Sequence, residues 1–174
     1  MQDYSLKIAE AIEEFLKIDD WNFEATDENG IIRFGIKLRC KFQHADIRVR
    51  VRQDSYLVLT TLPVTADEDS RAKVLDFINR ATYGFVHGNI EMDPRDGELR
   101  FRTSQNCGRD ILINSDIIKE SIYLNLSMVE RYGTPLMKVM MGVMTPEEAI
   151  EEAEGDGSGS SSDGDSDSPE FSLS

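Results

Sequence analysis

The spacing of apolar residues changes along the first third of the chain, and each spacing predicts a different element. Apolar residues from Leu6 to Leu16 recur at helical spacing, so residues 3–17 are expected to form an amphipathic helix. Apolar and polar residues then alternate, which predicts four strands, placed at residues 21–27, 32–38, 47–51 and 56–62. Asn29-Gly30, between the first two of them, is typical of a hairpin turn.

The middle of the chain returns to helical spacing and then predicts one further hairpin. Residues 67–83 are expected to be helical, and residues 86–104 alternate on either side of an acidic turn. Asp93 suits the first position of a type I turn and Pro94 the second. Gly97 can adopt the left-handed conformation that closes a bulged loop, so the turn is placed at these residues.

Helix signals dominate the C-terminal part of the chain. Asn114 or Ser115 can cap a long helix, and Gly133-Thr134-Pro135 is expected to interrupt it, because proline lacks a backbone N–H. Gly142 predicts the end of that region. The sequence Thr145-Pro146-Glu147-Glu148 matches a capping box, which predicts a final short helix.

The expected order is therefore helix, four strands, helix, two strands and helices. Strands that are grouped by hairpins indicate an α+β fold in which helices flank an antiparallel sheet (α-β-β-β-β-α-β-β-α). The chain has 174 residues, enough for one self-sufficient core. We expect residues 1–154 to form a single domain.

Charge separates the end of the chain from the rest. The net charge is −14, and eight of the 33 acidic residues follow residue 150 while none of the 19 basic residues does. Residues 155–174 are rich in Ser, Gly and Asp, and most of them offer no apolar side chain that could offset the entropy of ordering. The sequence predicts a disordered acidic tail.

Candidate chemistry is sparse, so the sequence predicts no enzyme, no cofactor and no metal site. Cys40 and Cys107 form no CxxC pair, and two unpaired thiols favour a reducing, cytoplasmic location. Arg109 could lower the pKa of Cys107, but an inert thiol is favoured because no base is close in sequence. His44 and His87 lie in different hairpins without neighbouring ligands. No signal peptide or bilayer-spanning apolar run is visible.

Two stretches carry a resemblance to a known family. VLDFINRATYGFVHGNIEMDPRDGELRFRTS and the ending GVMTPEEAIEEAE resemble YbjN-type domains, best over residues 67–153. The resemblance implies the fold of type III secretion chaperones, and it implies a bacterial regulator of sensory transduction. The chaperone branch binds polypeptides and is usually dimeric. The family has no established catalytic residues, so the resemblance implies a manner of binding and no catalytic site.

Eight basic residues are expected on one face of the sheet, because they alternate with apolar residues. They are Arg33, Lys37, Arg39, Arg48, Arg50, Arg52, Arg100 and Arg102. The favoured interpretation for most of them is neutralisation by Glu24, Glu91, Asp93 and Glu98 in cross-strand pairs. Unpaired members, with Arg48, Arg50 and Arg52 as candidates, would bind a partner. Nucleic acid is not predicted, since the fold is acidic and few aromatic residues point outward.

Methionine is concentrated near the end of the folded part. Met137, Met140, Met141 and Met144 recur at helical spacing, which favours a place in the core. Met140 and Met141 are adjacent and diverge by about 100°, so at least one is expected at the surface or at a subunit contact. Methionine-rich faces can repack around different apolar partners.

Together these patterns predict a non-enzymatic module that binds another polypeptide through an exposed helix or sheet face, as a homodimer. The alternative is a small-molecule sensor with a pocket between helices and sheet, lined by residues such as Phe85, Phe101 and Tyr123. The acidic tail is expected to dock on Arg48, Arg50 and Arg52, with Phe171 and Leu173 as an apolar latch. The alternative is a solubilising tail that touches nothing.

Overall fold

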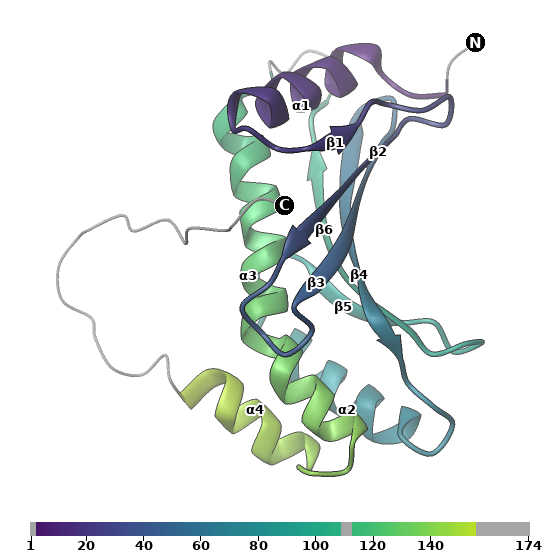
Figure 1. Ribbon diagram of the computed structural model, residues 1–174, viewed down its shortest axis with the longest axis vertical. Helices are drawn as coiled ribbons and strands as arrows, with labels where there is room; N and C mark the ends of the chain where they lie inside the picture. Colours follow the sequence, from purple (N-terminus) through teal and green to yellow (C-terminus); the bar gives the residue numbers. More distant parts are fainter. Residues whose placement is uncertain (1–2, 109–112, 156–174) are drawn as a thin grey trace, which may run out of the picture.

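The computed structural model describes residues 3–108 and 113–155. Six antiparallel strands form one sheet in the order β1-β2-β3-β4-β6-β5, and helices cover one of its faces (Figure 1). The α+β architecture expected from the sequence is confirmed. The elements in chain order are α1 (Leu6–Ile18), β1 (Phe23–Glu24), β2 (Ile31–Lys37), β3 (His44–Val51), β4 (Ser55–Thr65), α2 (Arg71–Tyr83), β5 (Asn89–Met92), β6 (Glu98–Asn106), α3 (Ser115–Met140) and α4 (Pro146–Gly155).

The first strand is much shorter than the predicted strand 21–27. Trp21 is buried between Phe34 and Tyr123, at ring-centroid distances of 5.2 and 6.4 Å, and its indole N–H donates to Asp19. Asp27 belongs to the following turn, because its backbone N–H donates to the carbonyl of Ile31. Core packing at one end and the turn at the other therefore leave only two residues, Phe23 and Glu24, to pair with β2.

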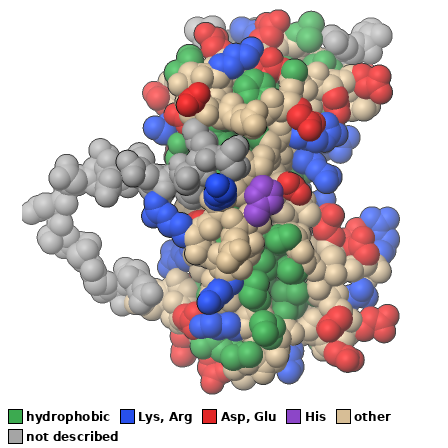
Figure 2. Space-filling view, in the orientation of Figure 1, with side chains coloured by type: hydrophobic (Ala, Val, Ile, Leu, Met, Phe, Trp, Pro, Cys, Tyr) green, Lys and Arg blue, Asp and Glu red, His purple; other side chains and the backbone are tan. Residues whose placement is uncertain are grey.

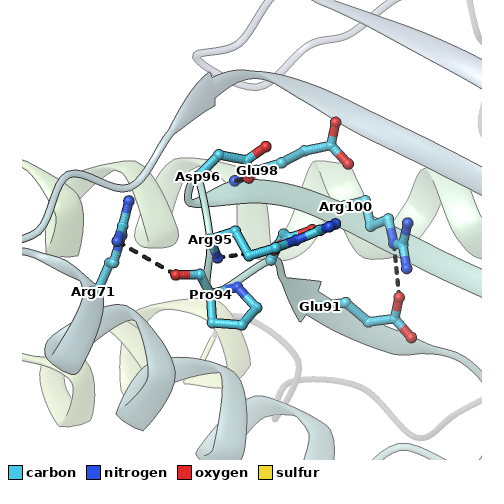
Figure 3. Close-up of polar contacts among 8 residues, drawn as sticks. Arg71, Glu91, Pro94, Arg95, Asp96, Glu98 and Arg100 are labelled. Atoms are coloured by element: carbon cyan, nitrogen blue, oxygen red, sulfur yellow. Dashed lines mark hydrogen bonds and ion pairs between the residues drawn. The ribbon is translucent and has the colours of Figure 1, made fainter.

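The hairpin between β5 and β6 turns as the sequence predicts. Gly97 has a φ of 78°, and its N–H donates to the carbonyl of Asp93 at 2.8 Å. The carbonyl of Gly97 in turn accepts from the N–H of Ala66 at 2.9 Å. Arg71 donates to the carbonyl oxygens of both Ala66 and Pro94, which fastens the hairpin tip to the start of α2 (Figure 3).

Helix α2 begins four residues later than the predicted start at residue 67. The carboxylate of Asp67 accepts from the N–H of Ser70 at 2.8 Å, so residues 67–70 form a turn ahead of the helix. The buried face of α2 is made by Val74, Phe77, Ile78 and Ala81. These residues are at the helical spacing that predicted the element.

The predicted interruption at Gly133-Thr134-Pro135 is wrong, since α3 continues through it to Met140. Tertiary contacts account for the difference. A side chain at Gly133 would lie within 3.2 Å of Phe42 and Cys40, so glycine lets the β2–β3 loop lie against the helix. Thr134 accepts a hydrogen bond from the N–H of Lys41 at 3.1 Å and caps no new turn. Burial of Pro135 offsets the backbone bond that proline removes.

The end of the described chain follows the predicted signals. Gly142 has a φ of 69°, and α3 ends just before it. The carboxylate of Glu148 accepts from the N–H and hydroxyl of Thr145, and the N–H of Glu148 donates back to that hydroxyl, which confirms the capping box. Helix α4 includes Gly155, which was predicted to be the first residue of the tail. Residues 156–174 lie outside the described residues.

A buried polar cluster joins α3 to the sheet. Asn125, with no exposed surface, accepts from the hydroxyl of Thr60 at 2.5 Å and donates to the carbonyl of Val58 at 3.1 Å. The hydroxyl of Tyr56 lies 2.9 Å from that of Ser121, and burial raises the pKa of Tyr56 to about 12. Within the described residues every buried side-chain nitrogen and oxygen has a partner. Such a cluster fixes how α3 sits on β4.

Candidate functional site

The side of the sheet away from the helices is left open by the described helices (Figure 1). Residues of one parity are buried beneath the helices, as Ala45, Ile47 and Val49 of β3 illustrate. Residues of the other parity lie on the opposite side, which no described helix covers (Figure 1). We call this side the open face. A sheet with one packed and one solvated side is usual for antiparallel strands.

Arginine and leucine stand beside each other at the centre of the open face. Arg48 of β3 lies directly opposite Leu59 of β4, and Arg50 lies opposite Leu57. Both arginines are exposed, and both leucines are half-buried. We call these four residues the Arg–Leu block. Cross-strand neighbours are about 4.5–5.5 Å apart at Cβ, so one bound segment can contact both kinds of side chain.

Arginines on the strands that flank the block are neutralised. Arg33 of β2 lies 2.8 Å from Asp27, and Glu91 of β5 binds both Arg100 and Arg102, at 2.7 and 3.0 Å (Figure 3 shows the Glu91–Arg100 pair). The predicted cross-strand neutralisation therefore holds for Arg100 and Arg102, through Glu91. Arg33 is paired instead with Asp27, an acid of the turn before β2 that was not among the four expected.

The arginines of β3 are not neutralised by the described residues, although neutralisation was the favoured interpretation for most of the eight basic residues. No acidic side chain in the described part of the chain forms an ion pair with Arg48, Arg50 or Arg52. The acid of β3 itself, Asp46, lies 3.4 Å from His44. Figure 2 shows acidic and basic side chains interspersed along the molecule. Asp46 lies on the same side of β3 as Arg48, two residues away, but it forms no ion pair with that arginine.

Other charged residues that were expected on this face lie in turns or at strand ends. Asp93 pairs with its neighbour Arg95 at 2.6 Å in the hairpin turn, and the hydrogen bond from Arg95 lowers the pKa of Asp93 to about 2. Arg39 follows the end of β2, in the loop against α3, where its N–H donates to the carboxylate of Glu130. Lys37 is exposed at the last position of β2.

A hollow adjoins the Arg–Leu block on the β1–β2 side. Its volume is about 410 Å³, and it opens where Gly35 contributes no side chain. Charged residues line it, namely Glu24, Arg33, Asp46 and Arg48, along with Asn22, Phe23, Phe34 and Ile47. The ring of His44 approaches Gly35 so closely that a Cβ there would lie 2.8 Å from it. The open face is thus uneven and mixed in charge around its two unpaired arginines.

The methionines divide between the core and the surface. Met137, Met140 and Met144 are partly buried and pack against the core, whereas Met141 is 70% exposed. Val143, two residues further, is 66% exposed. The expectation that one of the adjacent pair Met140 and Met141 reaches the surface matches this arrangement. The structure contains one chain, so their predicted role in binding stays a prediction.

The pocket residues predicted for a small-molecule sensor do not come together. Phe85 lines a cavity of about 580 Å³ beside the C-terminal end of α4. Phe101 has no exposed surface, and the hydroxyl of Tyr123 donates to Asp19 at 3.0 Å, near Trp21. The cavity is instead lined by Leu124, Met128, Arg131, Tyr132 and Glu154, among others. Of the three predicted residues, Phe85 lines this cavity, and Phe101 and Tyr123 do not.

Neither cysteine has the surroundings of a reactive thiol. Cys40 and Cys107 are both free and buried, and burial raises the pKa of each thiol. Arg109, which could lower the pKa of Cys107 according to the sequence, lies outside the described residues. The described residues contain no group of three or more potential metal ligands. None of the described helices is long and apolar enough to cross a membrane.

Sequence reasoning missed the two leucines of the Arg–Leu block. Leu57 and Leu59 interrupt the alternation of β4, because Tyr56, Val58 and Thr60 face the core and the strand reads as a continuous apolar run. Their direction follows from the neighbouring hairpin. Arg48 and Arg50 point outward, and the short turn between β3 and β4 fixes which residues of β4 stand opposite them.

Comparison with known proteins supports the fold and leaves the family open. No protein-family model matches the chain, and no curated protein matches it, so membership of the YbjN family stays a prediction. A chain in the crystal structure of the ExsC–ExsE complex matches with a TM-score of 0.52 and 12% sequence identity. The match covers 72% of this chain and 90% of that chain. This likeness shows that the fold is type III secretion chaperone-like.

Proposed function

We propose that the protein is a non-enzymatic protein-binding module, a chaperone-like or regulatory adaptor, that holds a segment of another polypeptide on the open face. The observation that carries this proposal is the Arg–Leu block, where two arginines that have no acidic partner among the described residues stand beside two half-buried leucines. The chaperone-like fold supports it, since the similar chain was crystallised in a complex of two proteins.

The chemistry of the block favours an acidic segment that also carries apolar side chains. A guanidinium binds a carboxylate through charge-assisted hydrogen bonds, which are about twice as strong as neutral ones. Covering Leu57 and Leu59 adds about 25 cal/mol for each Å² of apolar surface removed from water. An acidic side chain would meet Arg48 or Arg50 while an apolar neighbour covers a leucine.

Site-specific crosslinking tests this proposal. A photoreactive amino acid at Thr61, on the open face beside the block, is expected to give a protein adduct of defined mass in cells of the source organism. The same amino acid at Glu14, on the exposed side of α1, serves as the control and should not give that adduct. Adding Arg48→Glu and Arg50→Glu to the Thr61 variant should abolish the adduct, because carboxylates then repel the acidic segment.

Equal adducts from Thr61 and Glu14, or an adduct that survives the two charge reversals, would remove the open face as the binding site. Both arginines are exposed and form no ion pair within residues 3–108 and 113–155, so their replacement should leave the fold intact. Circular dichroism of the double variant checks this directly.

We also propose that two copies associate through the corner where α3 ends. Met141 and Val143 expose most of their apolar surface there, and the resemblance to dimeric chaperones favours self-association. The expected result is a dimer in light scattering at micromolar concentration, which Met141→Asp with Val143→Asp converts to a monomer. Leu6→Asp, at another exposed apolar residue, is the control. A wild-type chain that is monomeric at about 20 kDa would refute this.

The cavity beside α4 favours a second candidate function, the sensing of a small molecule. Its volume of about 580 Å³ is in the range of ligand pockets, and it combines the aromatic rings of Phe85 and Tyr132 with the charges of Arg131 and Glu154. Arg131 is held in place by a hydrogen bond to the carbonyl of Ala153. A metabolite that co-purifies with the native protein would favour this candidate.

A further inference from the structure

Three arginines in and just after β3, which form no ion pair among the described residues, share one spacing with three acids near the end of the sequence. Arg48, Arg50 and Arg52 occur at every second residue, and their side chains are exposed. Asp163, Asp165 and Asp167 also occur at every second residue. In extended chains this spacing places side chains on one side, about 6.6–6.8 Å apart. An extended acidic segment laid along β3 therefore matches it in number, sign and distance.

The apolar residues of the same segment match the leucines of the block. Ser168 and Pro169 suit the first two positions of a type I turn, which would reverse the chain after Asp167. Phe171 and Leu173 then return beside the acidic stretch with a two-residue spacing. Leu57 and Leu59 have that spacing on β4, next to β3. The segment thus offers apolar side chains where the open face has leucines.

The other cations of the described chain are less suited to receive these acids. Many are already paired, with Arg33, Arg80, Arg95, Arg100, Arg102 and Lys138 each within 4 Å of a carboxylate. Arg48 and Arg50 of β3 and Arg52 just after it form no such pairs among the described residues. Only seven residues separate Gly155 from Asp163, and a stretch from Gly155 to Asp165 spans at most about 36 Å. The tether gives an effective concentration on the order of millimolar.

We propose that residues 163–173 dock on the open face of their own chain, with the three aspartates on the β3 arginines and Phe171 and Leu173 on the leucines. This inference rests on the proposed function, because the segment would occupy the face that holds the partner and so regulate its access. A partner must then displace the segment, and its affinity falls by the fraction of molecules in which the face is covered.

A spin label at Ser162→Cys tests the docking in the full chain. The two native cysteines are buried, so the new thiol is the one expected to react. At low salt the label should broaden the amide resonances of Arg48 to Arg52 at least twofold more than those of α1. Asp163→Asn, Asp165→Asn and Asp167→Asn together should remove the excess broadening. Raising the salt should also remove it, because exposed ion pairs are screened.

Two controls separate the spacing from the charge. Exchanging two residues, Asp165→Ser with Ser166→Asp, keeps composition and net charge but breaks the two-residue spacing, and it should weaken the broadening at least twofold. Glu10→Gln, Glu14→Gln and Glu151→Gln change the net charge as much as the three asparagines, at exposed sites outside the segment, and should leave the broadening intact.

Equal broadening of β3 in the wild type and the three-asparagine variant would overturn the proposal. A second sample mixes spin-labelled protein with protein that carries no spin label, and the resonances of the latter are observed. Equal broadening of Arg48 to Arg52 in that sample would overturn the proposal as well, because the segment would then bind a second copy. The crosslinking result at Thr61 depends on a partner and not on the segment. An adduct at Thr61 without broadening would leave the proposed function standing and remove its regulation by the tail.

Discussion

Replacing Gly97 by valine is expected to lower the free energy of unfolding by about 3–5 kcal/mol. Two causes combine. The φ of 78° places a β-branched residue in a region that costs about 1–2 kcal/mol. A Cβ at Gly97 would also lie 2.0 Å from the carbonyl oxygen of Ala66, which is backbone and cannot swing away. Urea denaturation of the two proteins measures the difference.

Two other glycines serve as matched controls that separate the causes. Gly142 has a φ of 69° but nothing within 4 Å of its added Cβ, so Gly142→Val should cost only about 1–2 kcal/mol. Gly84 has a φ of −90° and is equally open, so Gly84→Val should cost less than about 1 kcal/mol. If Gly97→Val costs no more than Gly142→Val, the contact with Ala66 is not part of the native structure.

Replacing Asn125 by leucine is expected to lower the free energy of unfolding by about 3 kcal/mol, although leucine is similar in size. The change leaves the hydroxyl of Thr60 and the carbonyl of Val58 without their bonds to Asn125, in surroundings that water does not reach. Each buried polar group left unpaired costs about 1–3 kcal/mol. Thermal and urea unfolding of the variant measure the loss.

A double-mutant cycle with Thr60→Val tests whether the hydrogen bond itself is the cause. Valine removes the hydroxyl that Asn125→Leu would leave unpaired, and apolar replacement of both partners is much less costly than removal of one. The double variant should therefore lose at least about 0.5–1 kcal/mol less than the sum of the single variants. Strict additivity would mean that the two side chains act independently.

The sequence predicts those parts of the fold that local chemistry determines. The turns at Asn29-Gly30 and at Asp93 to Gly97 are right, because positive φ at glycine and a carboxylate at the start of the turn are local requirements. The capping box at Thr145 is right for the same reason, since both partners lie within four residues. Strand alternation correctly places Ile32, Phe34 and Ile36 in the core.

The errors lie where distant residues decide the outcome. At Pro135 the local signal for a break is overcome by the loop that contains Phe42, which packs on Gly133 from some ninety residues away in sequence. The isolation of Arg48 follows from its place between β2 and β4, which no local pattern contains.

The packing around Trp21 gives the molecule an optical reporter of its own. Trp21 is the single tryptophan of the chain, and its indole lies among Phe34, Tyr123 and the carboxylate of Asp19. Intrinsic fluorescence therefore reads the seating of α1 against α3. Helix α3 has 26 residues and is about 39 Å long. A change that moves α3 relative to α1 is expected to alter the surroundings of the indole and shift its emission, with no dye attached.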